Sequence, residues 1–170
     1  MTAAALNPTP GRGSGSAART LPVSRAILYA TLVVGLLDAT DGVVFLGLHG
    51  QNPIQVLQYI ASSLLGARSF SGGLATAGLG LVVHFAVSLV VATIYILASR
   101  RIAVLRTQWV LLGLLFGAAV WAVMNLVLLP LTAVAHGPIT TAALVNGVIG
   151  HALFVGLPRA FFAKKAELEG

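Results

Sequence analysis

Four long apolar runs alternate with short polar segments along the chain. The runs cover about residues 27–48, 74–98, 109–131 and 139–162. A helix needs about 20 apolar residues to cross the hydrocarbon core of a bilayer, and each run is long enough to do so. The pattern therefore predicts an all-α, polytopic integral membrane protein whose four transmembrane helices form a bundle over residues 25–163.

A shorter helical pattern lies between the first two runs, at about residues 53–65. Pro53 can occupy the first turn of a helix, and apolar residues recur on one side of the segment. The polar residues on or near the other side are Gln55, Gln58, Ser62 and Ser63. The segment is too short to span a bilayer, so we expect an interfacial or re-entrant helix with its polar edge toward water.

The two ends of the chain differ from the apolar runs. Residues 1–24 are rich in Ala, Gly, Ser, Thr and Pro and hold too little apolar material to pack, so we expect a flexible tail there. Residues 164–170 are expected to form a second short tail. The first apolar run is longer than the hydrophobic region of a typical signal peptide and contains two acids, so we expect it to be retained as a span.

Lys and Arg are distributed unevenly about the predicted spans. Of the ten basic residues, nine fall on one side of a four-span arrangement, and only Arg68 falls on the other. The nine are Arg12, Arg19, Arg25, Arg100, Arg101, Arg106, Arg159, Lys164 and Lys165. Because loops rich in Lys and Arg stay inside, both termini are expected in the cytoplasm. The same interface would carry an aromatic belt formed by Tyr29, Tyr95, Trp109, Phe161 and Phe162.

Composition narrows the class of protein and its partners. Apolar residues make up 58% and charged residues 8% of the chain, which excludes an ordinary soluble domain with about a quarter charged residues. The net charge of +6 does not indicate nucleic-acid binding, because the basic residues flank apolar runs instead of forming a patch with aromatics. The expected partners are the lipid bilayer and, as an open alternative, a second copy of the chain or other membrane subunits.

The first apolar run contains two carboxylates, Asp38 and Asp41, whereas the other two acids of the chain are Glu167 and Glu169. Residues three apart share a helix face, so the two Asp side chains point the same way. Their insertion cost of roughly 5–7 kcal/mol about equals the roughly 4–7 kcal/mol that the apolar residues of the run contribute. This span should therefore depend on neighbouring helices or on protonation.

Each of the other apolar runs also contains polar residues. By the helical rise of 1.5 Å per residue, they and the two acids lie roughly 9–18 Å from the outer ends of their spans. The candidate residues for binding an ion or substrate are Asp38, Asp41, His84, Asn125, Asn146 and His151. The functional interpretation is an acid pair that shares one proton and faces two imidazoles. The structural interpretation is that these groups form hydrogen bonds between helices and fix their register. Asn146 and His151 are roughly 140° apart around a helix, so both cannot point straight at one small site.

Two small-residue patterns predict close helix packing. The second run has an i+4 ladder with His84 in its middle, formed by Thr76, Gly80, His84, Ser88 and Ala92. The third run contains GLLFG at Gly113–Gly117, a small-xxx-small match that is common in membrane helices.

Three functions remain open at this point. The first is a small transporter or channel-like protein that uses the two Asp residues, with proton linkage through His84 or His151. The second is a non-catalytic membrane subunit, and the third is a haem or metal redox protein. No paired metal-ligand motif such as Glu-x-x-His is present, and neither is a G-x-S-x-G, H-E-x-x-H or P-loop signature. We therefore expect no cofactor and no metal, assign no catalytic residue, and do not expect an enzyme.

The segments LDATDG, QNPIQVLQYIASSLLG and VNGVIGH, set in this span pattern, resemble small uncharacterised four-helix inner-membrane proteins of bacteria. The resemblance covers about residues 27–165. It implies a four-helix fold in the bacterial inner membrane, and it assigns no role to any residue.

Overall fold

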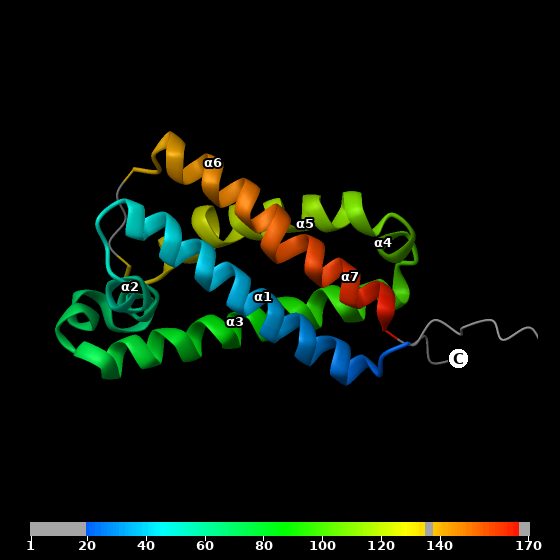
Figure 1. The fold of residues 1–170 in the computed structure, drawn as a ribbon, viewed down its shortest axis with the longest axis horizontal. Helices are drawn as coiled ribbons and strands as arrows, with labels where there is room; N and C mark the ends of the chain where they lie inside the picture. Colours follow the sequence, from blue (N-terminus) through cyan, green and yellow to red (C-terminus); the bar gives the residue numbers. More distant parts are fainter. Residues whose placement is uncertain (1–19, 135–137, 167–170) are drawn as a thin grey trace, which may run out of the picture.

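The computed structural model describes residues 20–134 and 138–166, and all regular elements in that part are helices. Four helices are long and apolar enough to cross a membrane (Figure 1). They are α1 (Val23–Leu48), α3 (Gly73–Arg101), and the longer helices Trp109–Leu131 and Thr141–Lys165. The predicted all-α membrane protein with four spans is confirmed. Most of the tails predicted at residues 1–24 and 164–170 lies outside the described residues.

The third and fourth spans each contain a π-helical turn next to a proline. The third consists of α5 (Trp109–Val123), the π-helix η2 (Met124–Leu128) and the 3-10 helix η3 (Leu129–Leu131). The fourth consists of α6 (Thr141–Gly150), the π-helix η4 (His151–Gly156) and α7 (Leu157–Lys165). Pro130 and Pro158 lack an amide hydrogen, and a proline ring clashes with the carbonyl four residues earlier. The wide π turn before each proline accommodates that clash without ending the span.

The predicted short helix is present as α2 (Pro53–Leu65) with the expected bounds. A reciprocal capping box fixes its start: Asn52 accepts a hydrogen bond from the Gln55 amide at 3.0 Å, and the Gln55 side chain accepts one from the Asn52 amide at 2.9 Å. The 3-10 helix η1 (Gly66–Ser71) follows. Figure 1 views α2 nearly end-on while α1 and α3 run across the picture, so α2 crosses the spans steeply.

The predicted water-facing polar edge of α2 is wrong for Gln58 and Ser62, whereas Gln55 is exposed. Gln58 and Ser62 are only 4% and 2% exposed, and the Gln58 amide donates to the Gly73 carbonyl at 3.0 Å on α3. The apolar Ile54 and Leu64 are instead exposed. Beside a hydrocarbon core the stable arrangement turns polar groups toward protein partners and apolar groups outward, which reverses the amphipathic rule of soluble helices.

Glycine seams hold the spans together. Gly113 and Gly117 of α5 lie against the fourth span, where a Cβ on Gly113 would come within 2.7 Å of the Ala160 Cβ. A Cβ on Gly117 would overlap the His151 carbonyl, and one on Gly156 would overlap the Gly113 carbonyl. The GLLFG match therefore marks a true packing seam.

The small-residue ladder predicted in the second span packs against two different helices, α2 and α1. Gly80 touches the Leu57 carbonyl of α2 so closely that a Cβ would overlap it. Ser88 and Ala92, which lie one and two turns after His84, are buried. The Ser88 hydroxyl donates to the Thr31 carbonyl of α1 at 3.2 Å. The ladder thus changes partner along its length.

The two described ends of the chain meet at one end of the bundle (Figure 1). The Leu21 amide donates to the Lys165 carbonyl at 2.7 Å. A tightly packed apolar cluster lies just inside this end, and we call it the terminal plug. Its residues are Ala26, Ala30, Ala92, Tyr95, Ile96, Ala160, Ala163 and Ala166.

One residue of the predicted aromatic belt belongs to this plug. Tyr95 is 2% exposed and packs on Phe116 with ring centroids 4.5 Å apart, because its α3 face is turned into the bundle. The other four aromatic residues gather near each other at the same end, with contacts Tyr29–Phe162, Trp109–Phe161 and Phe161–Phe162.

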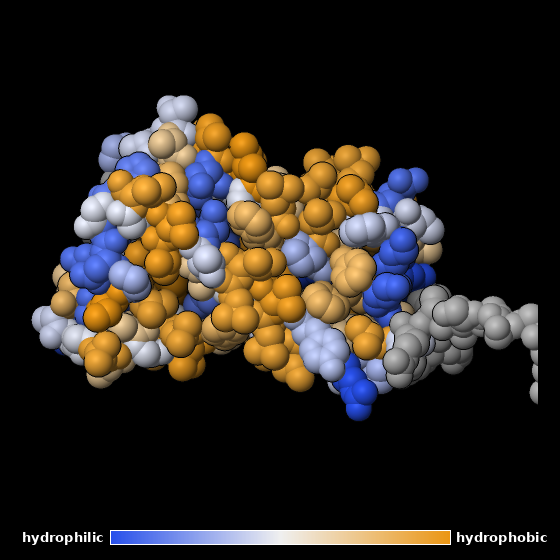
Figure 2. All heavy atoms as spheres, viewed as in Figure 1, coloured by the Kyte–Doolittle hydropathy of each residue, from blue (hydrophilic) through white to orange (hydrophobic). Residues whose placement is uncertain are grey.

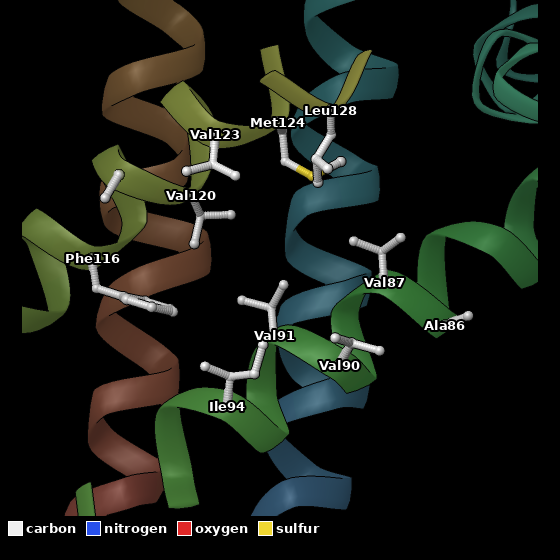
Figure 3. A pocket seen from close by; sticks show the side chains of 11 residues that line it. Ala86, Val87, Val90, Val91, Ile94, Phe116, Val120, Val123, Met124 and Leu128 are labelled. Atoms are coloured by element: carbon white, nitrogen blue, oxygen red, sulfur yellow. The ribbon is translucent and has the colours of Figure 1, made fainter. Parts of the chain in front are cut away.

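The spans do not close into a complete ring. A groove of about 480 Å³ separates α3 from α5 and η2, and its walls are apolar throughout (Figure 3). They include Val90, Ile94, Phe116 and Met124. Figure 2 shows an apolar band around the middle of the visible face, with hydrophilic residues concentrated toward both ends. Both features match a hydrocarbon environment.

Candidate functional site

Two polar pairs join α1 to the fourth span. The Asn146 amide donates to Asp41 Oδ2 at 3.1 Å. One turn deeper, His151 Nδ1 lies 3.8 Å from Asp38 Oδ1, and these two side chains are 21% and 24% exposed. Four of the six candidate residues are therefore brought together.

The antiparallel course of the two helices explains how both Asn146 and His151 reach the acids. Going along α1 from Asp38 to Asp41 corresponds to going back along the fourth span from His151 to Asn146, so each polar side chain meets its own carboxylate. His151 is the first residue of the π-helix η4. π-helical turns of this kind are frequent at functional sites. The roughly 140° between Asn146 and His151 around an ideal helix is therefore compatible with the structure, because each side chain contacts a different carboxylate.

Gly150 makes room for the acid pair. A Cβ at this position would lie only 2.6 Å from Asp41 Oδ2, so a larger residue would push the carboxylate away. Gly150 itself is buried. The small residue next to His151 therefore lets the acid approach the backbone of the fourth span.

The other two candidates lie apart from these pairs. The His84 imidazole is hydrogen-bonded through Nε2 to the Gly35 carbonyl of α1 at 2.8 Å. The Asn125 amide donates to the Trp121 carbonyl of its own helix at 3.0 Å. The structure thus places one imidazole, not two, against the acids.

Arg159 is a polar residue of this region that is not among the six candidates. Its position near the end of the fourth span predicts a flanking charge, yet it is 2% exposed. Its Nη1 donates to the Val155 carbonyl at 3.1 Å, and its Nη2 donates to the Ser88 carbonyl and hydroxyl at 3.3 and 3.0 Å. Because Ser88 also bonds Thr31, this guanidinium ties three spans together. The negative charge of Asp38 favours the charged form of the guanidinium.

A signal for that burial was present in the sequence. Gly156 and Ala163 lie three residues before and four after Arg159, on the same helical face. Both are buried. An arginine set in a small-residue stripe of a span points toward other helices, and the simple count of flanking charges overlooks this.

The chemistry available here is proton exchange and cation binding. An imidazole beside a carboxylate can take or release a proton near neutral pH. Among the described residues no group of three or more His, Asp or Glu side chains could hold a metal ion. His84 and His151 have separate partners, the Gly35 carbonyl and the Asp38 carboxylate.

No protein-family model, curated protein or solved structure matches the chain. The likeness to small bacterial inner-membrane proteins therefore stays a likeness of span pattern, and the function rests on the geometry above.

Proposed function

We propose that the protein is a small proton-linked membrane transporter or channel-like protein in which Asp38 and His151 hold the proton. The observation that carries this proposal is the 3.8 Å separation of His151 Nδ1 and Asp38 Oδ1. This nitrogen is buried and has no hydrogen-bond partner in the described part of the chain. Ionisable groups inside a membrane are costly and commonly mark proton or ion pathways.

The pair can exist in two forms of low charge. With one shared proton on Asp38, both side chains are neutral; with the proton on His151, they form an ion pair with no net charge. Moving the proton between these forms leaves the net charge of the pair at zero, and the short distance between the two groups favours the ion-pair form over two isolated buried charges. An imidazole can both accept and donate a proton, so such a pair has the groups needed to load and release one.

The residues around the Asp38–His151 pair favour proton access from the outer side of the membrane. Asp41 and Asn146 lie between the pair and the outer end of the spans, and Asp38 is roughly 15 Å from that end by helical rise. Toward the other end stands the terminal plug, whose Ala30, Ala92 and Ala160 are fully buried. We therefore propose that the proton enters from the polar side and crosses only when the plug loosens, as in a carrier.

The proposed location is the bacterial inner membrane with both termini in the cytoplasm. Arg25, Arg100, Arg101 and the pair Lys164–Lys165 lie at helix ends beside the terminal plug, whereas Arg68 lies in η1 beside the opposite ends. Burial of Arg159 removes one residue from this count and leaves the asymmetry in place. The positive-inside rule supports this orientation.

Proton flux in liposomes tests the proposal. Purified protein is reconstituted with an internal pH-sensitive dye, and a potassium gradient with valinomycin drives proton entry. The wild type should acidify the lumen faster than protein-free liposomes, and D38N and H151Q should fall to the protein-free rate. H49Q is the matched control, because His49 is exposed at the end of α1 and its imidazole is hydrogen-bonded to the Phe45 carbonyl of its own helix. Wild-type flux equal to the protein-free rate would overturn the proposal, as would full flux in D38N and H151Q.

A second candidate is a membrane subunit whose polar groups serve assembly, with itself or with other subunits. It is favoured by the way several polar side chains end on backbone carbonyls of neighbouring helices, as His84 does on Gly35 and Ser88 on Thr31. In that case D38N would lower stability or disrupt a larger complex, measured by native mass spectrometry, while the wild type would conduct no protons.

A further inference from the structure

A hollow of about 410 Å³ lies beside Asp41 on the outward side of α1. Its walls come from α1 and the π-helix η4, and they are Leu36, Leu37, Thr40, Asp41, Val44 and Phe154. Leu36 and Val44 are 61% and 56% exposed, so the hollow opens on the surface that faces lipid in a membrane. A ligand can reach it sideways from the bilayer.

One ionisable group faces an otherwise apolar space there. The Thr40 hydroxyl donates its hydrogen to the Leu36 carbonyl of its own helix at 2.7 Å. That hydrogen is therefore already used within the helix. Asp41 Oδ2 accepts a single hydrogen bond from Asn146; in the part of the chain that the structure describes, no other donor reaches this carboxylate. Such a group next to hydrocarbon is stabilised by a positive charge.

The size and lining of the hollow indicate the class of ligand. Small-molecule sites are typically about 300–1,000 Å³, mostly apolar, with few polar groups. A bare divalent metal ion prefers about six oxygen ligands, which one carboxylate and one amide do not supply. An organic cation needs only one carboxylate for its charge and apolar walls for its body.

We infer that the hollow beside Asp41 binds a lipophilic organic cation, with its charge against Asp41 and its apolar body against Leu36, Val44 and Phe154. Asp38 and His151 lie one turn deeper along the same helices. The bound cation would be the substrate whose movement the proton on that pair drives, so this inference rests on the proposed function. Binding can nevertheless be measured without transport.

The test is equilibrium dialysis of radiolabelled tetraphenylphosphonium with the purified full chain in detergent. The wild type should bind the cation, and D41N should weaken binding by about 10- to 100-fold, the loss that follows from removing a charged partner. Tetraphenylborate has the same shape and the opposite charge, so its retention should not fall in D41N. Thermal unfolding of D41N checks that the variant is folded.

A second variant keeps the inference testable if D41N fails to fold. L36W fills the hollow from a lipid-facing position and should abolish cation binding without affecting the core. L32W is its matched control, because Leu32 is 45% exposed one turn away and does not line the hollow. Equal binding by wild type, L36W and L32W, or by a folded D41N, would overturn the inference, as would no binding by the wild type.

The two proposals fail separately. Proton flux through Asp38 and His151 without binding of tetraphenylphosphonium would refute only the lipophilic cation. Binding that depends on Asp41, with wild-type proton flux at the protein-free rate, would refute the proton-linked transporter and leave a cation site.

Discussion

Arg159 donates hydrogen bonds to both the carbonyl and the hydroxyl oxygen of Ser88, at 3.3 and 3.0 Å, and so joins the fourth span to the second. The same hydroxyl donates to Thr31 of the first span at 3.2 Å. A buried guanidinium inside a membrane protein is stable only when its donors are satisfied. The Ser88 hydroxyl therefore stabilises both the buried charge of Arg159 and the contact between the first and second spans.

Replacing Ser88 by alanine should lower the free energy of unfolding by about 1–2 kcal/mol, since interhelical hydrogen bonds in membranes are individually modest. Steric trapping in bicelles or unfolding in mixed micelles measures this. T93A is the control, because the exposed Thr93 hydroxyl donates to the Leu89 carbonyl of its own helix and does not bridge two spans. An S88A protein as stable as T93A would contradict the bridging role.

Glycine seams give a second stability prediction. G117A places a Cβ on the His151 carbonyl and should destabilise the protein by roughly 1–3 kcal/mol, the usual cost of overpacking. G78A is matched to it, because Gly78 lies within α3 and a Cβ there would have no described atom within 4 Å. That variant should be neutral or more stable by up to about 1 kcal/mol. Equal unfolding curves for G117A and G78A would rule out the tight seam.

The sequence was sufficient for the fold because hydrophobic length is a direct physical requirement of crossing a bilayer. It predicted all four spans and the bounds of α2, where Asn52 and Pro53 are local start signals. It also identified Asp38, Asp41, Asn146 and His151, which the structure brings together, since polar residues in apolar runs stand out.

What the sequence did not reveal depends on rotation and partner choice. Whether Gln58 faces water or α3 is decided by the neighbouring Gly73 carbonyl, which periodicity does not show. A count of flanking charges treats Arg159 as a cytoplasmic anchor, and its small-residue helix face does not reveal that Ser88 is its partner. The π turn that begins at His151 is likewise a response to packing and to Pro158.

The orientation of α2 can be tested with single cysteines, because the native chain has none. S62C conserves the size of a residue that is 2% exposed, whereas L64C lies at a position 63% exposed. In liposomes, a membrane-permeant maleimide should modify L64C much faster than S62C. Faster modification of S62C would mean that the polar side of α2 faces outward.

The topology proposal is tested by the same chemistry in intact cells. Cysteines at Ser14 and Glu169 should resist a membrane-impermeant maleimide until the cells are opened, and a cysteine at His136 should react at once. Labelling of either end from outside would contradict the arrangement with both termini in the cytoplasm.

The Asp38–His151 pair is tested most directly by infrared spectroscopy of the protonated carboxyl band in lipid, as a function of pH. The wild type should show a carboxyl band whose intensity changes with pH, because the pair is proposed to take up and release a proton. D38N should fold normally and lose that band, and H151Q should move its midpoint. E167Q/E169Q removes the other two acids of the chain outside the span and should leave the band unchanged. A wild type without a titrating band, or a D38N spectrum identical to the wild type, would contradict the proton-carrying pair.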